Sequence, residues 1–318
     1  MRVMVTGGAG FIGSNLVDAL LARGDDVVCY DNFDNFYDPA VKRGNIRHNI
    51  GNPKFALVEG DVRDKNKLKE TIDAHGVEGI LHMAGRPGVR PSLEDPNLYQ
   101  DVNVNGTINV LDAMRNTGVR NLVFASSSSV YGVNSKVPFS EDDPIERPIS
   151  PYAASKRAAE LFCYTYHHLY KLPVTCVRIF TSYGPRQKPE MAISKFVHHI
   201  HHGKEIPFFG DGTSKRDYTF ISDTVDGLVS ALDKPHPFEI VNLGSGRTVE
   251  LSHLVSLIEK HVGKKAKINR LPDQPGDVPL TYADIGKARR LLGYEPKVGM
   301  EDGIRRFVDW FRQGQVKA

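Results

Sequence analysis

The stretch Ser150-Pro151-Tyr152-Ala153-Ala154-Ser155-Lys156 opens an amphipathic run that continues to about Lys171. Proline is well tolerated in the first turn of a helix, and a serine directly before it is a common N-cap. The stretch therefore predicts a helix in which Tyr152 and Lys156 lie one turn apart on the same face. A phenol ordinarily titrates near pH ~10, and a neighbouring ammonium favours the phenolate and lowers this pKa. We interpret the pair as a proton acceptor; the alternative is an ordinary surface tyrosine and lysine.

A glycine-rich turn follows the first predicted strand. Residues 2–6 form a short apolar run, and Gly7-Gly8-Ala9-Gly10-Phe11-Ile12-Gly13 leads from it into a helical pattern that stops at Arg23-Gly24. Strand, glycine turn and helix in this order favour a dinucleotide site, because glycines let the backbone approach a pyrophosphate closely. The first gap between glycines is one residue longer than in the usual fingerprint. The cofactor contacts predicted here are Gly7, Gly10, Phe11, Ile12 and Gly13.

A carboxylate ends the second predicted strand. Asp31 lies 18 positions after Gly13, where it would accept hydrogen bonds from a ribose diol and repel a 2′-phosphate. This placement favours NAD over NADP; the alternative is that Asp31 and Asn32 simply form a turn. The third strand ends just before Asp61 and Val62, which could contact an adenine.

Strands and helices alternate along the first half of the chain. Apolar runs at 79–83, 121–125 and 174–178 are separated by helical patterns over about 95–117 and 152–171. This alternation predicts an α/β fold, a doubly wound parallel sheet (Rossmann) with a smaller α/β substrate-binding domain.

The two domains are expected to interleave in sequence. We place the NAD-binding domain at residues 1–180, with a returning segment near 222–245 that contains a strand at 239–243. The substrate domain spans 181–318, and helices at 252–262 and 303–311 close it.

Composition excludes several classes of protein. The 318 residues carry 41 basic and 38 acidic side chains, which gives no nucleic-acid footprint. Cys29, Cys163 and Cys176 lie inside apolar runs, as reduced core cysteines do. No apolar run approaches the ~20 residues that a membrane span needs, and no signal peptide precedes the first strand. We expect a cytoplasmic protein that does not bind membranes.

Four serines, Ser126 to Ser129, follow the fifth strand. Ligands of open α/β sheets gather at the carboxyl ends of the strands, so these hydroxyls would lie near a substrate alcohol. The alternative is an ordinary serine-rich loop, which the nearby Tyr152 and Lys156 make less attractive.

With the glycine turn and the set Ser127, Tyr152 and Lys156, the chain resembles the extended short-chain dehydrogenases/reductases, in particular the nucleotide-sugar epimerases and dehydratases. Asn103-Val104-Asn105-Gly106-Thr107, Tyr183-Gly184-Pro185-Arg186, Arg216-Asp217-Tyr218 and Pro275-Gly276-Asp277-Val278 follow in the family's order. The resemblance implies NAD as cofactor, a UDP-sugar as substrate, and Ser127, Tyr152 and Lys156 as catalytic residues. It further implies cofactor contacts from Ala84, Gly85, Asn103, Tyr152, Lys156 and Phe180.

The residues after Ser127 bear on the type of reaction. Family dehydratases carry Asp-Glu at these two positions, whereas this chain has Ser128 and Ser129, which cannot abstract a C5 proton. Elimination is therefore disfavoured and a 4-epimerase remains. Within the family, the chain resembles the UDP-glucuronate 4-epimerases most at four places. These are Arg90, Thr181, Gln274 and the segment Arg186-Gln187-Lys188-Pro189-Glu190-Met191-Ala192. The substrate contacts implied are Arg90, Ser127, Ser128, Ser129, Tyr152, Thr181, Arg186, Lys188, Phe209 (uracil), Arg216 (diphosphate), Gln274 and Asp277.

Other functions stay open from the sequence. One alternative is a UDP-glucose or UDP-N-acetylglucosamine 4-epimerase; another is an NAD-sensing protein without catalysis. His198, His199, His201 and His202 share helix faces, yet they have no nearby carboxylate or cysteine, so we predict a solvated helix end and no metal. The apolar positions at 95–117 and 152–171 exceed what one sheet face needs. The resemblance implies a homodimer formed through these helices; the alternative is a broader internal core.

Overall fold

Seven parallel strands form the central sheet of the computed structural model, which describes residues 1–115, 117–134, 136–272 and 278–315. Their order is β11-β6-β5-β4-β1-β2-β3, so the chain reverses direction across the sheet between β1 and β4. The expected doubly wound fold is confirmed, and ligands of such sheets bind at this reversal. The strands are β1 (Arg2–Thr6), β2 (Asp26–Asp31), β3 (Phe55–Glu59), β4 (Gly79–His82), β5 (Asn121–Ser127), β6 (Val174–Ile179) and β11 (Phe238–Leu243).

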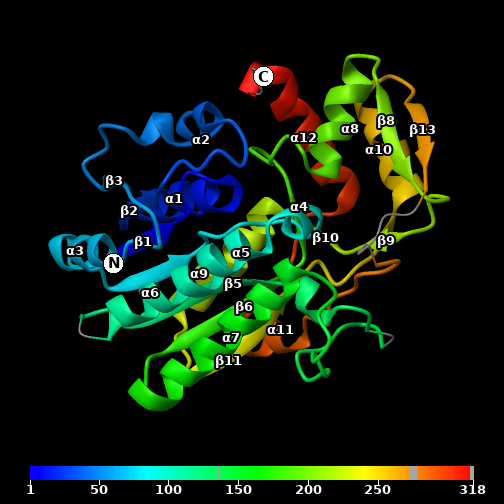
Figure 1. Cartoon of the computed structure of the whole chain (residues 1–318). Helices are drawn as coiled ribbons and strands as arrows, with labels where there is room; N and C mark the ends of the chain where they lie inside the picture. Colours follow the sequence, from blue (N-terminus) through cyan, green and yellow to red (C-terminus); the bar gives the residue numbers. More distant parts are fainter. Residues whose placement is uncertain (116, 135, 273–277, 316–318) are drawn as a thin grey trace.

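Helices cover both faces of this sheet because alternate side chains of each strand point to opposite sides. Val3 and Val5 of β1 enter one core with α1 (Phe11–Arg23) and α9 (Ile221–Asp233). Met4, between them, enters the other core, which is closed by α3 (Lys65–His75), α6 (Gly106–Met114) and α7 (Pro151–Tyr170). In Figure 1 the helices α6 and α7 lie together on one side of the strands. The strands are buried on both faces, as parallel strands usually are.

A smaller α/β unit follows β6. Its strands β8 (Glu205–Phe209) and β13 (Lys267–Leu271) pair in parallel, and α8 (Ala192–His201), α10 (Leu251–Val262) and α12 (Met300–Trp310) pack with them. Figure 1 shows this group set apart from the central sheet. Two short pairs connect the units: β7 (Thr181–Tyr183) with β10 (Tyr218–Phe220), and β9 (Lys215–Arg216) with β12 (Val249–Glu250).

Strand β11 returns from the second half of the chain to the edge of the first sheet, where it pairs in parallel with β6. A strand was expected at 239–243, and the structure has it at Phe238–Leu243. The division at residue 180 and the bounds of the substrate domain stay predictions.

The helix expected over 95–117 runs without a break over residues 96–114, but it changes its winding along the way. It consists of α5 (Pro96–Tyr99), the π-helical segment η2 (Gln100–Asn105) and α6. Such π turns are common where a side chain must be placed for function. Here η2 carries the buried Asn103. The remaining elements are α2 (Pro39–Ile46), η1 (Arg47–Asn49), α4 (Val89–Glu94), η3 (Ser128–Tyr131), α11 (Gly286–Leu292) and η4 (Phe311–Gln315).

Candidate active site

The N-terminal turn of α7 faces the end of β5. Ser150 is the N-cap, with its hydroxyl accepting a 3.1 Å hydrogen bond from the Ala153 amide, as the sequence predicted. This cap places Tyr152 near Ser127, whose hydroxyl acts to lower the pKa of the tyrosine. One turn later, Lys156 Nζ donates a 2.8 Å hydrogen bond to the carbonyl oxygen of Ala125. The structure thus brings together the three side chains predicted to be catalytic.

Burial dominates the electrostatics of this trio. It raises the pKa of Tyr152, and the nearby Ser127 hydroxyl only partly offsets this rise. The lowered pKa that was expected for Tyr152 is therefore wrong for this geometry, in which burial prevails and the ammonium of Lys156 is directed at Ala125 and over the Phe124 ring. Burial also lowers the pKa of Lys156 to about 8, with a smaller contribution from the neighbouring cation Lys188.

Asn103 connects the loop after β4 to α7. Its Oδ1 accepts a 2.7 Å hydrogen bond from the Arg86 amide, and its Nδ2 donates to the Arg86 carbonyl at 3.0 Å and to Ser155 Oγ at 2.9 Å. A Cβ at Gly85 would lie 2.9 Å from Asn103 Oδ1 and 3.1 Å from Lys156 Nζ. Residues 84–86 are therefore held directly beside Lys156, as expected if Asn103 positions the cofactor loop.

The glycine turn has the shape that a pyrophosphate requires. Gly7 has a φ of +66°, and a Cβ there would lie 2.8 Å from the Ala84 amide nitrogen. A Cβ at Gly13 would lie 2.1 Å from the Gly7 carbonyl oxygen, so only glycine lets α1 start this close to β1. Gly10, the N-cap of α1, leaves the first amides without a side-chain cap, and Phe11 and Ile12 form the first turn. Helix N-termini of this kind bind phosphates.

Asp31 lies at the carboxyl end of β2, next to this turn. Its two oxygens accept hydrogen bonds from the Ala9 amide at 3.0 Å and from the Phe33 amide at 2.8 Å. Burial raises the pKa of this carboxyl. Each carboxylate oxygen has a further lone pair, so the group can still accept from a ribose diol.

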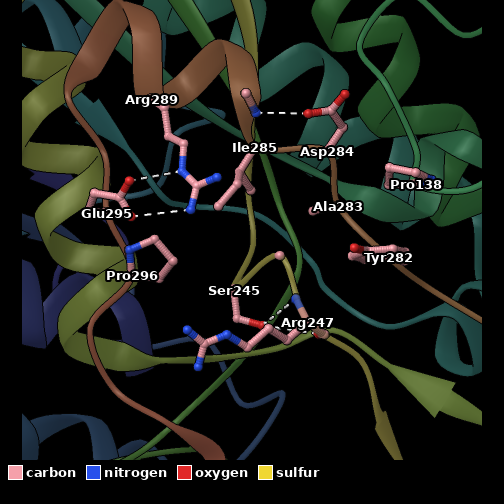
Figure 2. Close-up of a pocket in the computed structure, with 12 residues that line it drawn as sticks. Pro138, Ser245, Arg247, Tyr282, Ala283, Asp284, Ile285, Arg289, Glu295 and Pro296 are labelled. Atoms are coloured by element: carbon pink, nitrogen blue, oxygen red, sulfur yellow. Dashed lines mark hydrogen bonds and ion pairs between the residues drawn. The ribbon is translucent and has the colours of Figure 1, made fainter.

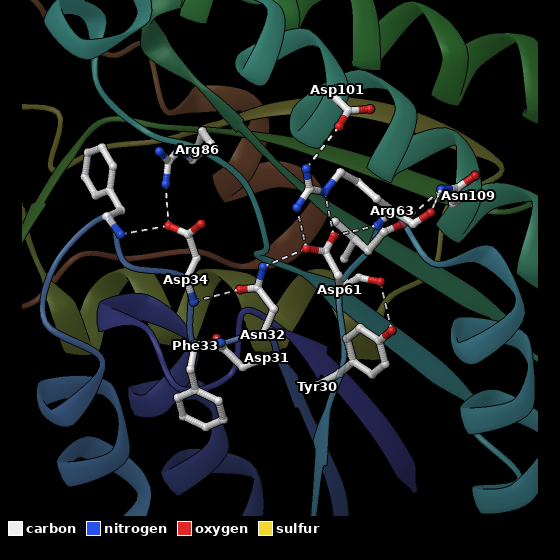
Figure 3. A network of polar contacts seen from close by, with 12 residues as sticks. Tyr30, Asp31, Asn32, Phe33, Asp34, Asp61, Arg63, Arg86, Asp101 and Asn109 are labelled. Carbon is white, nitrogen blue, oxygen red and sulfur yellow. Dashed lines mark hydrogen bonds and ion pairs between the residues drawn. The ribbon is translucent and has the colours of Figure 1, made fainter. Parts of the chain in front are cut away.

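Asp61 is the centre of the polar network in Figure 3. It accepts hydrogen bonds from Asn32 Nδ2 at 2.8 Å and from the Arg63 guanidinium at 2.8 and 3.0 Å. The bonds from Arg63 are the main reason that the pKa of Asp61 is lowered to about 2. The next residue, Val62, is buried against α6 at Gly106. The residues predicted to line the adenosine half of the site are therefore assembled at one edge of the sheet.

A second contact in Figure 3 was not predicted from the sequence. Arg86 forms an ion pair with Asp34, and Asp34 also accepts from the Phe36 amide at 2.8 Å. The Arg86 guanidinium lies 5.0 Å from the centre of the Phe36 ring. This ion pair joins the loop after β2 to the loop after β4, one on each side of the glycine turn. The only available signal, alternating Asp, Asn and aromatic residues after Asp31, does not identify a partner 52 positions away.

The positive side chains that were predicted to bind the substrate contact different parts of the protein. Lys188 Nζ lies 5.3 Å from the centre of the Phe36 ring, and burial lowers its pKa to about 8. Arg186 forms a 2.6 Å ion pair with Asp18 of α1. Arg90, from α4, lies 4.7 Å over the ring of Phe209, from β8. Lys188 therefore faces the loop after β2, while Arg90 and Phe209 approach each other across the two units.

The remaining predicted contacts lie near the ends of β5, β6 and β9. Ser128 and Ser129 begin η3 and are half-buried. The amide of Thr181 donates a 3.2 Å hydrogen bond to the Asp217 carbonyl. The buried Phe180 ring packs in the core with Tyr131 and Phe139. Arg216 Nη1 donates a 3.0 Å hydrogen bond to the Lys215 carbonyl. Gln274 and Asp277 lie outside the described residues. All these roles in ligand binding stay predictions.

Asp217, which follows Arg216, is an anchor that the sequence analysis missed. It is fully buried and accepts from the amides of Ser245, Gly246 and Ala283 at 2.6, 3.1 and 3.2 Å. It therefore fixes the backbone next to Arg216. The sequence offered only the position of the Arg216-Asp217-Tyr218 motif, and this position does not show that Asp217 has a structural role.

A pocket of about 220 Å³ lies elsewhere, between α11 and the loop after β11. Figure 2 shows Arg289 paired with Glu295 on one side of it and Ser245 and Arg247 on the other. None of the predicted site residues lines this pocket, so it is separate from the candidate active site.

The histidines of α8 lie at a solvent-accessible helix end, as expected, with His202 exposed and His198, His199 and His201 half-buried. His198, His201 and His202 pack their rings around Phe311, with the His201 and Phe311 ring centres 5.3 Å apart. Within the described residues, no group of three or more His, Cys, Asp or Glu side chains could hold a metal ion. Over the same part of the chain, no helix combines the length and apolarity needed to cross a membrane.

Comparison with known proteins gives consistent matches over nearly the whole chain. The model of the family described as GDP-mannose 4,6 dehydratase matches residues 4–307. UDP-glucuronate 4-epimerase of Thermodesulfobacterium geofontis is 42% identical over 311 residues, which cover 98% of this chain and 96% of that protein.

Two solved structures are similar in fold. UDP-glucuronic acid 4-epimerase from Bacillus cereus, in complex with UDP-glucuronic acid and NAD, matches with a TM-score of 0.93 at 36% identity over 98% of this chain and 99% of that chain. UDP-glucose 4-epimerase from Thermotoga maritima, with UDP-glucose, matches with a TM-score of 0.91 at 32% identity over 98% and 99%. The chain therefore belongs to the family that the GDP-mannose 4,6 dehydratase model describes, the nucleotide-sugar epimerases and dehydratases of the extended short-chain dehydrogenase/reductase type.

Proposed function

We propose that this protein is an NAD-dependent epimerase that inverts C4 of a UDP-sugar, converting UDP-glucuronate to UDP-galacturonate. The observation that carries the proposal is the meeting of Ser127, Tyr152 and Lys156 at the end of β5, with Lys156 one turn behind Tyr152 and bound to the Ala125 carbonyl. The similarity to UDP-glucuronate 4-epimerases over nearly the full length supports the choice of substrate.

Tyr152 performs the acid–base chemistry. Its phenolate takes the proton of the C4 hydroxyl, and Ser127 donates a hydrogen bond to the same oxygen as its charge develops. Lys156, held by Ala125, supplies the positive charge that favours the phenolate over the phenol. Because burial alone raises the pKa of Tyr152, this charge and that of the oxidised nicotinamide must together overcome the cost of forming the phenolate.

The residues present fit NAD. Its role there would be to supply reversible hydride transfer at C4, out from one face of the sugar and back to the opposite face of the 4-keto sugar. The turn containing Gly7, Gly10 and Gly13 leaves room for the pyrophosphate, and Asp31 can accept from a ribose. The Arg86–Asp34 ion pair closes the adjacent loops, which favours a cofactor that stays bound between turnovers.

A glucuronate substrate imposes a special requirement on this site. Once C4 is a ketone, the C6 carboxylate is β to it and is lost easily when the C5–C6 bond aligns with the carbonyl. Ser128, Ser129 and Thr181 are neutral and half-buried, so they can hold the carboxylate away from this alignment without acting as a base. We assign positive charge near it to Arg90, Arg186 or Lys188.

We further propose a homodimer through α7. Leu161, Phe162, Tyr164 and Leu169 of this helix are exposed, and a second copy would bury them. A cytoplasmic location is supported by Cys29, Cys163 and Cys176, which are buried and not disulfide-bonded.

The proposed function is tested by incubating the purified protein with UDP-glucuronate, UDP-glucose and UDP-N-acetylglucosamine separately and resolving the products by NMR. Accumulation of UDP-galacturonate, with much slower turnover of the neutral sugars, is the expected result. Preferred turnover of UDP-glucose would assign the protein to the neutral-sugar epimerases. Failure to convert any of the three would reject the proposal.

A further inference from the structure

Glu160 takes no part in the steps described above, yet it lies at the centre of a buried polar network beneath them. Arg178 Nε donates to Glu160 Oε1 at 2.9 Å and its Nη2 donates to Oε2 at 3.0 Å, and both side chains are at most 1% exposed. Ser126 Oγ donates to the same Oε1 at 2.6 Å. A buried ion pair of this kind contributes little net stability, because desolvation costs about as much as the attraction gains.

The position of Glu160 relates it directly to the catalytic lysine. Lys156 and Glu160 lie one turn apart on α7, and they bind consecutive residues of β5, the Ala125 carbonyl and the Ser126 hydroxyl. Ser127 is the next residue of the strand. Two successive turns of α7 are thus attached to the strand end that presents Ser127 to the helix.

Arg178 extends this attachment to β6 and β11. It lies opposite Ser126 in the register of β5 and β6, so both side chains point toward α7. Its Nη1 donates to Tyr131 Oη at 3.0 Å, and that hydroxyl donates to Asn242 Oδ1 at 2.7 Å. Tyr131 is the last residue of η3. The serine tract is therefore fixed at its start by the bond from Ser126 to Glu160 and at its end by the bond from Arg178 to Tyr131.

We propose that Glu160 is a positioning residue for the epimerase reaction: with Arg178 it holds the end of β5 against α7, so that Ser127 and Ala125 meet Tyr152 and Lys156 at reacting distance. This inference rests on the proposed function. A displacement of the serine hydroxyl of the order of 1 Å would cost far more in rate than in stability.

The carboxylate also acts on the charge of its neighbour. Burial and the cation Lys188 lower the pKa of Lys156, whereas the negative charge of Glu160 raises it. Removing that charge therefore moves the deprotonation of Lys156 to lower pH. A purely structural role for the ion pair would not require this change.

Two variants test the proposal. Ser126→Ala removes the link between Glu160 and the strand without leaving a charge unpaired, and Glu160→Met/Arg178→Met replaces the ion pair with apolar side chains of similar volume, which cores tolerate well. Arg157→Met is the matched control, because Arg157 also donates to Glu160, at 3.1 Å, but comes from the solvent side of α7.

We expect Ser126→Ala and the double variant to lower kcat by about tenfold or more, with KM and the thermal midpoint little changed. Arg157→Met should keep kcat. In a further variant, Glu160→Gln, which removes the negative charge and leaves that of Arg178, the alkaline limb of the pH–rate profile should move to lower pH. If Ser126→Ala keeps the kcat of the unmodified protein, the proposal is wrong, whether or not the double variant folds.

A second measurement separates this proposal from the proposed function. The protonation of Lys156 can be followed by NMR of side-chain-labelled lysine, with Lys156→Arg identifying its signal. A lower pKa of Lys156 in Glu160→Gln supports the coupling to Glu160 even if the protein converts no UDP-sugar. An unchanged pKa of Lys156, with unchanged kcat in an active enzyme, would overturn it.

Discussion

Lys156 Nζ donates a 2.8 Å hydrogen bond to the carbonyl oxygen of Ala125, the residue two positions before Ser127. The lysine is 5% exposed, and among the described residues Glu160 is the carboxylate that raises its pKa. Its ammonium is therefore held by the strand that carries the serine, rather than by an ion pair of its own. This arrangement makes the protonation of Lys156 sensitive to pH in the range where enzymes work.

Activity should decrease on the alkaline side with an apparent pKa near that of Lys156. Burial lowers this pKa to about 8, so the side chain is charged below that pH and loses its proton as the pH rises through it. Because the charged form favours the Tyr152 phenolate, kcat should fall above this point in a pH–rate profile.

Lys188→Met is the control for this assignment. The charge of Lys188 lowers the pKa of Lys156, so removing it should move the alkaline limb to higher pH. A limb that moves to lower pH in this variant, or stays in place, would show that another group controls it.

Tyr152→Phe should lower kcat by about 10²–10⁴-fold, because it removes the acid–base group but keeps the ring. The ring packs edge-on against Tyr99 with centres 6.2 Å apart, so the fold and the NAD content should be preserved. The measurement is single-turnover epimerisation together with the NAD content of the purified protein. Retained turnover would exclude Tyr152 as the base.

The hydroxyls near the sugar carboxylate should control the ratio of products. Ser128→Ala/Thr181→Ala removes two groups proposed to hold the carboxylate away from alignment with the C4 ketone. We expect UDP-pentose, the product of CO₂ loss, to increase relative to UDP-galacturonate in an NMR assay. An unchanged product ratio at reduced rate would show that these residues affect turnover only.

The exposed face of α7 should form the subunit contact. Leu161 and Leu169 are 51% and 59% exposed and lie eight residues apart on the helix. Leu161→Glu/Leu169→Glu should give a monomer in light scattering. Ile268→Glu, on β13 and 45% exposed in the smaller unit, should leave the mass unchanged. A wild-type protein that is already monomeric would refute the proposed dimer.

Local sequence signals predicted much of the fold and the core of the site. The glycine turn, the strand before Asp31 and the helix opened by Ser150 depend on residues within one or two turns of one another, and each lies where it was expected. Tyr152 and Lys156 could be placed on one face because helix geometry fixes residues four apart.

Features that depend on distant side chains could not be predicted in this way. The Arg86–Asp34 ion pair joins residues 52 positions apart, and the network of Glu160 and Arg178 depends on the register of β5 and β6. The pKa of Tyr152 was misjudged for the same reason. Lys156, one turn along the helix, could be identified from the sequence. The burial that raises the pKa of Tyr152, however, comes from the packing of other elements.

The most direct test of the central claim is epimerisation of UDP-glucuronate that carries deuterium at C4. If Tyr152 moves only the hydroxyl proton while C4 gives up and regains a hydride within one site, UDP-galacturonate should form with its deuterium retained at C4 and no exchange with solvent. Loss of that deuterium to water, or a product altered at C5 instead of C4, would contradict the account.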